Sequence, residues 1–217
     1  MNFFRDLWRI AKSDKPALVG GVVIIIYIIV AIVGPVFVHI GYQQNSSLAY
    51  LPPSLKYPLG TDFLGDSVLS EVIVGTRPIM EVGIAAAVMV VFVGVTVGLV
   101  AGYLGGAVDQ IVMRITDVFL TIPGLPLVIV IASVVKTTNP LALAGILSIA
   151  GWAGLARAVR SQALSLRTSD FVDAAKVQGL PLRNMVARQL LPNVGPYVAI
   201  HFLLAVTDAI YAEVGLY

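Results

Sequence analysis

The sequence has 217 residues, of which 58% are hydrophobic and only 12% are charged, and its mean hydropathy is +0.93. So apolar a chain cannot be an ordinary soluble domain, because it needs lipid to cover its surface. It contains no cysteine, which excludes disulfides, thiolate metal sites and cysteine nucleophiles, and its two histidines cannot form a metal-binding cluster. The formal net charge is +2, so the distribution of charges along the chain is more informative than their sum.

The N-terminal segment, residues 1–16, mixes basic residues with large apolar ones. This pattern predicts an amphipathic cytoplasmic segment that can lie on an anionic membrane surface. Residues 17–38 follow without a charge. At about 1.5 Å per residue they can cross a hydrocarbon core of about 30 Å, so they are predicted to form the first transmembrane helix. The apolar run is too long for a cleaved signal peptide, and no Ala-x-Ala site closes it.

A polar, proline-bearing interval follows at residues 39–78. It contains two charged clusters, Asp62 with Asp66 and Glu71 with Arg77, which are unsuited to lipid. We therefore expect this interval to be an extracytoplasmic segment. The rest of the chain, residues 79–217, is expected to form the membrane core of the protein.

The second predicted span is 82–104. Glycines recur at every fourth position through its second half and just beyond its end, at Gly94, Gly98, Gly102 and Gly106. Glycines at this spacing form one smooth helix face that a neighbouring helix can approach closely. Packing within the chain is favoured over contact with another subunit, and both remain open. After this span, Arg114 and Asp117 are three residues apart and are expected to lie near each other on a helix.

Three further spans are predicted at 118–135, 140–156 and 194–216, the first of them with prolines in its opening turns. The last span contains Asp208, the one aspartate deep within a span. Ionisable residues inside membranes are costly and usually line a cavity or pair internally. Asp208 is therefore expected either to line a translocation path or to hold two spans together. Glu213, near the end of the same span, is expected to be solvated.

The polar interval 170–193 is predicted to form two short helices joined by a tight turn. Asp170 is expected to cap the first helix, and Gly179 to end it in the left-handed conformation. Pro181 suits the first turn of the second helix, and Pro192 is expected to stop that helix.

One face of the first of these short helices carries small side chains and is predicted to fit into a groove of another protein. The residues on that face are Phe171, Ala174, Ala175 and Gln178.

The spacing Asp173-Ala-Ala-x3-Gly179, with Pro192 thirteen residues after the glycine, resembles the "EAA" loop of permease subunits in binding-protein-dependent ABC importers. In that family the loop is the cytoplasmic element that docks into the ATP-hydrolysing subunit. The resemblance therefore implies that residues 157–193 form a coupling loop. Its implied contact residues are Phe171, Asp173, Ala174, Ala175, Gly179 and Pro192.

Two further segments, 58–77 and 101–123, resemble the dipeptide, oligopeptide and nickel branch of these importers, and specifically the second, "C-type" permease of the pair. The chain departs from that pattern at Gly65-Asp66-Ser67, where the family usually has Gly-Arg-Asp, and at Glu71, where it has a basic residue. Asp173 stands where the family usually has Glu, which keeps the charge but shortens its reach.

Eleven of the fourteen Lys and Arg residues lie in the N-terminal segment, in 105–117 and in 157–193. The positive-inside rule therefore predicts that the N-terminus and the 157–193 loop are cytoplasmic. The fold class is an all-α polytopic membrane protein, and the resemblance implies a type I ABC importer transmembrane domain. Five spans are present, and the chain is expected to stop before the family's sixth.

No catalytic or metal site is predicted, because the chain lacks a P-loop and a His-Glu-x-x-His motif. The resemblance implies that ATP and Mg²⁺ are bound by two partner ABC ATPases. It also implies a homologous but non-identical second permease, an extracytoplasmic solute-binding protein, a prokaryotic cytoplasmic membrane and no nucleic acid. The alternative is a secondary transporter or channel without an ATPase, which internal inverted repeats would support. The branch handles dipeptides, oligopeptides, nickel complexes, glutathione and some sugars, and the residues do not choose among them.

Overall fold

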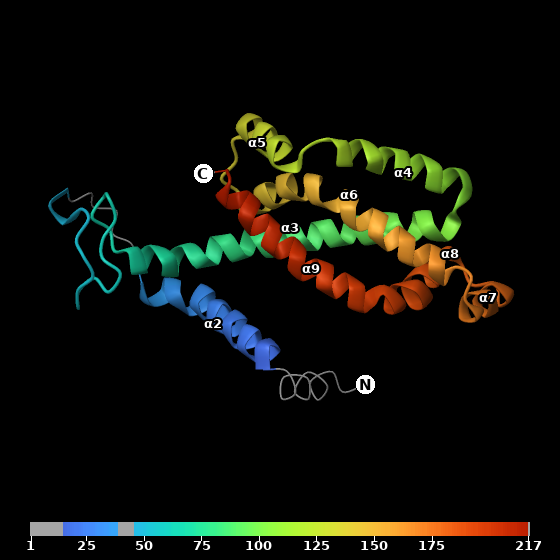
Figure 1. Ribbon diagram of the computed structural model, residues 1–217, viewed down its shortest axis with the longest axis horizontal. Helices are drawn as coiled ribbons and strands as arrows, with labels where there is room; N and C mark the ends of the chain where they lie inside the picture. Colours follow the sequence, from blue (N-terminus) through green and yellow to red (C-terminus); the bar gives the residue numbers. More distant parts are fainter. Residues whose placement is uncertain (1–14, 39–45, 217) are drawn as a thin grey trace. The chain divides into compact units, whose positions relative to one another are not determined.

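The computed structural model describes residues 15–38 and 46–216, and the ordered elements in this part of the chain are helices (Figure 1). The chain divides into two compact units, Met1–Met80 and Glu81–Tyr217. Most of the predicted amphipathic N-terminus, residues 1–14, lies outside the described residues, as do residues 39–45 of the predicted extracytoplasmic segment.

The first unit contains α2 (Lys15–Phe37), which coincides closely with the first predicted span. Ala31 is its buried residue, and its other side chains are largely exposed, as expected for a helix surrounded by lipid. Gly34 allows the first turns of α3 to pack closely against α2, because a Cβ atom at Gly34 would overlap Cγ2 of Ile73.

The polar segment after α2 begins with a short 3₁₀ turn, η1 (Ser46–Leu48), and is held by two side chains. The Thr61 hydroxyl donates to the carbonyl of Leu48 (2.5 Å) and accepts from the amide of Leu51 (2.8 Å). Oδ1 of Asp62 accepts from the amides two and four residues further on, at 2.9 and 2.7 Å. These bonds give this stretch a defined path without a sheet.

The next helix, α3 (Val68–Leu104), begins ten residues before the predicted end of the polar interval. The apolar residues between 68 and 77 follow a helical period, and the charges of Glu71 and Arg77 lie near the helix end rather than in its apolar part. At about 1.5 Å per residue, α3 is about 55 Å long, so it extends well beyond a hydrocarbon core of about 30 Å.

Helix α4 (Gly106–Thr121) runs back alongside α3 after a sharp corner at Gly105 (Figure 1). Gly105 has a φ angle of +66°, and a Cβ atom there would overlap Nη1 of Arg167. The corner therefore needs glycine for its conformation, whereas the guanidinium of Arg167 ends a flexible side chain and can move aside.

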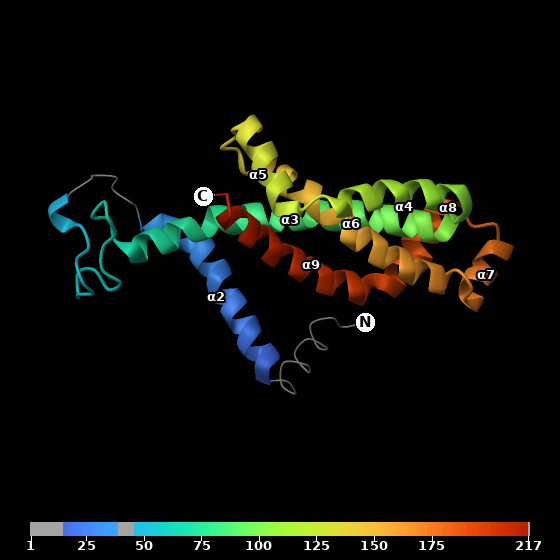
Figure 2. The same cartoon turned by 45° about the horizontal axis from the view of Figure 1, so that its top comes forward.

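The predicted uninterrupted third span, 118–135, is wrong. Helix α4 continues to Thr121, and α5 (Gly124–Val135) leaves it at an angle of 83° (Figure 2). Ile122 is extended because it precedes a proline, and Pro123 is itself extended at the start of α5. The two prolines of this stretch were assigned to the first turns of one helix, but Pro123 instead ends the preceding helix.

Helix α6 (Pro140–Leu166) lies at the centre of the second unit and packs against α4, α5 and α9. The Asn139 side chain caps it by accepting from the amides of Leu141 and Ala142. It extends ten residues beyond the predicted span, so Arg157 and Arg160 lie on a helix and not in a loop.

The remaining elements are α7 (Asp170–Val177), α8 (Leu182–Asn184), the π-helical η2 (Met185–Leu190) and α9 (Leu191–Val214). Two buried apolar clusters hold the second unit together. One joins α3, α6, α7, η2 and α9, and the other joins α3, α5, α6 and α9. In the described part of the chain, four helices are long and apolar enough to cross a membrane, or five if α4 and α5 form one broken span.

Candidate functional site

Helix α7 has an inner face fixed to the protein and an outer face that is free. Val172 and Ala175 are almost completely buried, at 0% and 3% exposure, in the cluster that also contains Met185 and Leu190. Ala175 was predicted on the face offered to another protein, and this placement is wrong. Phe171, Ala174 and Gln178 are exposed and follow the helical period on a face that lies directly beside the buried one.

The start of α7 differs by one residue from the prediction. Its N-cap is Ser169, whose hydroxyl donates to the carbonyl of Leu166, and Asp170 is the first helical residue instead of the cap. Asp170 and Asp173 both lie in the first turn, where the helix dipole favours a negative charge. Asp173 also pairs with Lys176 at 2.8 Å, and Lys176 donates to the carbonyl of Arg167 at 3.1 Å.

Gly179 ends α7 in the left-handed conformation, with φ at +69°. The amide of Gly179 donates to Lys176 and that of Leu180 to Ala175, so the turn satisfies carbonyls at the helix end. A Cβ atom at Gly179 would meet nothing within 4 Å. Glycine is therefore required here for its backbone conformation and not for space.

The predicted helix stop at Pro192 is also wrong, because the backbone stays helical from Leu182 to Val214. Pro181 is the N-cap of α8, one residue before its expected place, and Pro192 lies in the first turn of α9. A proline is tolerated in the first turn of a helix. The π-helical turns of η2 directly before it change the hydrogen-bond register, so the chain can pass the proline without a break.

Two ion pairs join α4 to α6. Arg160 donates to both carboxylate oxygens of Asp109, and Arg157 pairs with Asp117. The predicted proximity of Arg114 and Asp117 therefore does not produce a pair, because Asp117 bonds across to α6. The bidentate geometry of Arg160 fixes both position and orientation, so it ties the first turn of α4 to the C-terminal third of α6.

The glycine face of α3 packs against α6 of the same chain. Cβ atoms at Gly94, Gly98 and Gly102 would lie 3.0, 2.5 and 2.6 Å from the nearest atom, always one of α6. Gly106 does not belong to this face: it lies beyond the end of α3, has a φ angle of +55°, and faces open space.

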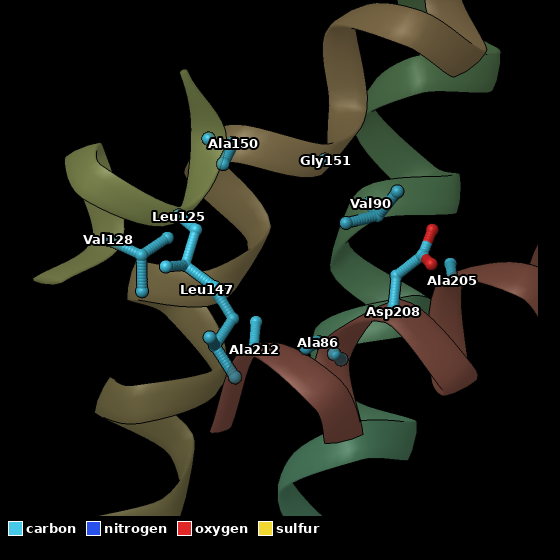
Figure 3. A pocket seen from close by; sticks show the side chains of 12 residues that line it. Ala86, Val90, Leu125, Val128, Leu147, Ala150, Gly151, Ala205, Asp208 and Ala212 are labelled. Carbon is cyan, nitrogen blue, oxygen red and sulfur yellow. The ribbon is translucent and has the colours of Figure 1, made fainter. Parts of the chain in front are cut away.

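A cavity of about 200 Å³ lies between α3, α5, α6 and α9 (Figure 3). Seven of its twelve lining residues are alanine or glycine, and Asp208 is the one charged residue among them. Asp208 is exposed and makes no hydrogen bond or ion pair with any other described residue. The structure thus places the carboxylate singled out in the sequence on the wall of a cavity.

Glu213, one turn and a half further along α9, differs from its expected solvated state. It is 5% exposed, and its Oε2 has no hydrogen-bond partner in the described part of the chain. Its position near the end of an apolar run suggested contact with water, but α9 turns this side chain inward beside the buried Ala209.

These features accompany a clear match to a known family. The family model described as "binding-protein-dependent transport system inner membrane component" matches residues 94–217. This chain belongs to that family. The matched residues include most of the glycine face, both α4–α6 ion pairs, α7 and the cavity wall formed by α5, α6 and α9.

A second family model, for the N-terminal transmembrane domain of oligopeptide transport permease C, matches residues 2–53 of this family member. Similar curated proteins include a dipeptide transport system permease protein of Bacillus subtilis (strain 168), 34% identical over 98% of this chain and 67% of that protein. An oligopeptide transport system permease protein of the same organism is 33% identical over 98% of this chain and 70% of its own length. An oligopeptide transport system permease protein of Haemophilus influenzae is 34% identical over 96% of this chain and 69% of its own length.

Sequence reasoning missed the α4–α6 ion pairs and the inward position of Glu213. A signal for the pairs was present, because Asp109, Asp117, Arg157 and Arg160 are charges in an otherwise apolar chain and such charges usually find partners. Their pairing could not be assigned, because it depends on how α4 and α6 pack.

One acidic group lies in the first unit of this family member. Carboxylate oxygens of Asp62, Asp66 and Glu71 lie within 4.8 Å of one another, a spacing that a cation could bridge. Asp62 already uses Oδ1 to accept two backbone amides that shape the turn. Loop geometry therefore explains the position of Asp62, the first residue of the group.

Proposed function

We propose that this chain is one permease subunit of an ABC importer that carries peptides across the cytoplasmic membrane of a prokaryote. The observation that carries the proposal is the two-sided α7. Its inner face is buried in the protein core, and its exposed face carries an aromatic residue, an alanine and a glutamine. A partner protein can bind the exposed face of such a helix, and the buried face then passes any displacement to the protein core. The names of the similar proteins, which are dipeptide and oligopeptide permeases, support peptides as the substrate class.

The buried contacts of α7 supply a route for that force. Val172 and Ala175 share one apolar cluster with Leu99 of α3, Val159 of α6 and Val194 of α9. Because packed interiors have few voids and low compressibility, a displacement of α7 moves the attached helices with it. An ATPase that closes on the exposed face would therefore rearrange the helices around the cavity.

The remaining components follow from this role. Two ABC ATPases bind ATP and Mg²⁺, and one of them docks on α7. A homologous second permease completes the path, and an extracytoplasmic binding protein delivers the solute. Asp208 lines the path on this chain's side. The basic loops, including the one that contains α7, and the N-terminus face the cytoplasm.

The absence of cysteine from the sequence allows a direct test of the docking face. In the assembled complex, an Ala174→Cys variant carrying a short bifunctional maleimide should crosslink to the ATPase. The matched control is Leu55→Cys, a fully exposed position in the predicted extracytoplasmic segment, which should not crosslink to it. Efficient crosslinking from Leu55→Cys, or none from Ala174→Cys, would contradict the proposed docking.

The same approach tests orientation and energy source. A membrane-impermeant maleimide added to intact cells should label Leu55→Cys, and it should label Val177→Cys, which is 89% exposed, only after permeabilisation. Peptide uptake should require the ATPases and ATP. Uptake that persists without them, driven by an ion gradient, would favour a secondary transporter.

A further inference from the structure

We propose that Asp208 binds the N-terminal ammonium of the transported peptide, while the apolar part of the cavity takes the first side chain. This inference rests on the proposed function and assigns part of the substrate to one group of this chain. It predicts that the permease itself discriminates peptides with a free amino group from those without one.

The cavity has a polar side and an apolar side. Figure 3 shows the Asp208 carboxylate beside Val90 of α3 and Ala205 of α9, while Leu125, Val128 and Leu147 lie on the other side of the view. A ligand that matches both sides carries a positive charge next to a small apolar group. The N-terminal residue of a peptide has this arrangement, because its ammonium and its side chain are attached to the same carbon atom.

The negative charge of Asp208 favours a cation at this position. Asp208 lies within the long apolar α8–η2–α9 span, where an isolated carboxylate is costly, and no described residue neutralises it. A metal ion fits poorly, because the other lining residues are apolar and Ca²⁺ requires six to eight oxygen ligands. An ammonium group needs only a few hydrogen bonds and can receive the strongest of them, a charge-assisted one, from a single carboxylate.

The size of the cavity fits one residue and not a whole peptide. Ligand pockets for complete small molecules usually measure about 300–1,000 Å³, whereas a cavity of about 150 Å³ already holds a benzene-sized group. The volume of this cavity, about 200 Å³, is larger than that of a benzene-sized site and smaller than that of a usual small-molecule pocket. It therefore suits a side chain of small or medium size together with its ammonium group.

The test compares dialanine with N-acetyl-dialanine, in which a neutral acetamide replaces the terminal ammonium. Binding of each to the purified, nucleotide-free permease–ATPase complex is measured by equilibrium dialysis, without the binding protein. The wild-type complex should bind dialanine at least about tenfold more tightly, as expected for one charge-assisted hydrogen bond. Asp208→Asn should bind the two compounds equally, and Asp208→Glu should retain part of the preference.

The matched control is Glu213→Gln, which makes the same carboxyl-to-amide change on the same helix at a residue that does not line the cavity. It should discriminate as the wild type does. Unchanged discrimination in Asp208→Asn, or none in the wild type, would overturn the inference. So would loss of the second permease from the Asp208→Asn complex, because a cation of that subunit would then be the partner of Asp208.

Uptake measured in parallel separates this inference from the proposed function. If the wild-type complex imports no peptide but discriminates in dialysis, the proposed function fails and the ammonium site stands. If peptide is imported with ATP but Asp208→Asn discriminates normally, the transport function stands and the ammonium site is refuted.

Discussion

The packing of α3 on α6 leads to a graded prediction for alanine substitutions on the glycine face. At Gly98 an ideal Cβ atom would lie 2.5 Å from the carbonyl oxygen of Ala156, 2.9 Å from Cβ of Val159 and 3.0 Å from the amide nitrogen of Arg160. Two of these are backbone atoms and the third is a Cβ atom, so none can move aside without shifting α6. At Gly94 the nearest atoms lie at 3.0 Å and include the side chain of Leu155, which can adjust.

Gly98→Ala should therefore destabilise the protein by about 1–3 kcal/mol, the usual cost of overpacking a well-packed interior. Gly94→Ala should cost less. The matched control is Gly145→Ala in α6, where an added Cβ meets nothing within 4 Å. That substitution should be neutral or should stabilise the helix by up to about 1 kcal/mol, because glycine is unfavourable in a helix interior.

Thermal unfolding of the purified complex, followed by intrinsic fluorescence, measures these effects. For a domain of this size a change of 1 kcal/mol shifts Tm by about 2–4 °C, so Gly98→Ala should unfold several degrees below Gly145→Ala. Peptide uptake should fall in the same order, because α6 carries the Arg160 pair and part of the core beneath α7. Equal Tm values for Gly98→Ala and Gly145→Ala would refute the close approach of α3 to α6.

Two further substitutions test the coupling region and the α4–α6 contact. Gly179→Val should lower uptake without preventing membrane insertion, because a residue with a Cβ atom in the left-handed conformation costs about 1–2 kcal/mol. Gly179→Asn should stay close to wild type, because asparagine tolerates that conformation. Equal uptake by the two variants would show that the left-handed turn is unimportant. Asp109→Asn should destabilise the complex by about 1.5–3 kcal/mol, because it weakens a mostly buried bidentate pair. Asp117→Asn affects an exposed pair and should cost no more than about 1 kcal/mol. The two aspartate substitutions are measured as Tm shifts, and a larger effect of Asp117→Asn would contradict the assigned burial.

The predictions that succeeded from the sequence depend on local chemistry. The long apolar runs before 38, before 104 and after 194 each formed helices able to cross a membrane, because a helix pairs its own backbone polar groups and so does not expose them to lipid. Gly179 adopts the left-handed conformation that its place after α7 predicted, since glycine reaches it without steric cost. The spacing of Asp173, the two alanines and Gly179 likewise pointed to the family that residues 94–217 match.

The predictions that failed depend on which neighbour each residue meets. Ala175 and Phe171 belong to the same short helix, and only the core formed by distant residues such as Met185 decides that Ala175 is the buried one. Asp117 had a nearby arginine in sequence but bonds to Arg157, because the packing of α6 on α4 brings that guanidinium closer.

The cavity is the clearest case of a feature that only tertiary structure created. Asp208 was recognisable from the sequence as a carboxylate in an apolar span, and its cost in lipid implied some function. The sequence left open a path and a helix contact, because the order of residues along a chain does not show what surrounds a side chain. The packing of α3, α5, α6 and α9, together with the break at Pro123 that turns α5 toward them, produced an apolar chamber. The carboxylate on its wall pairs with no other residue that the structure describes.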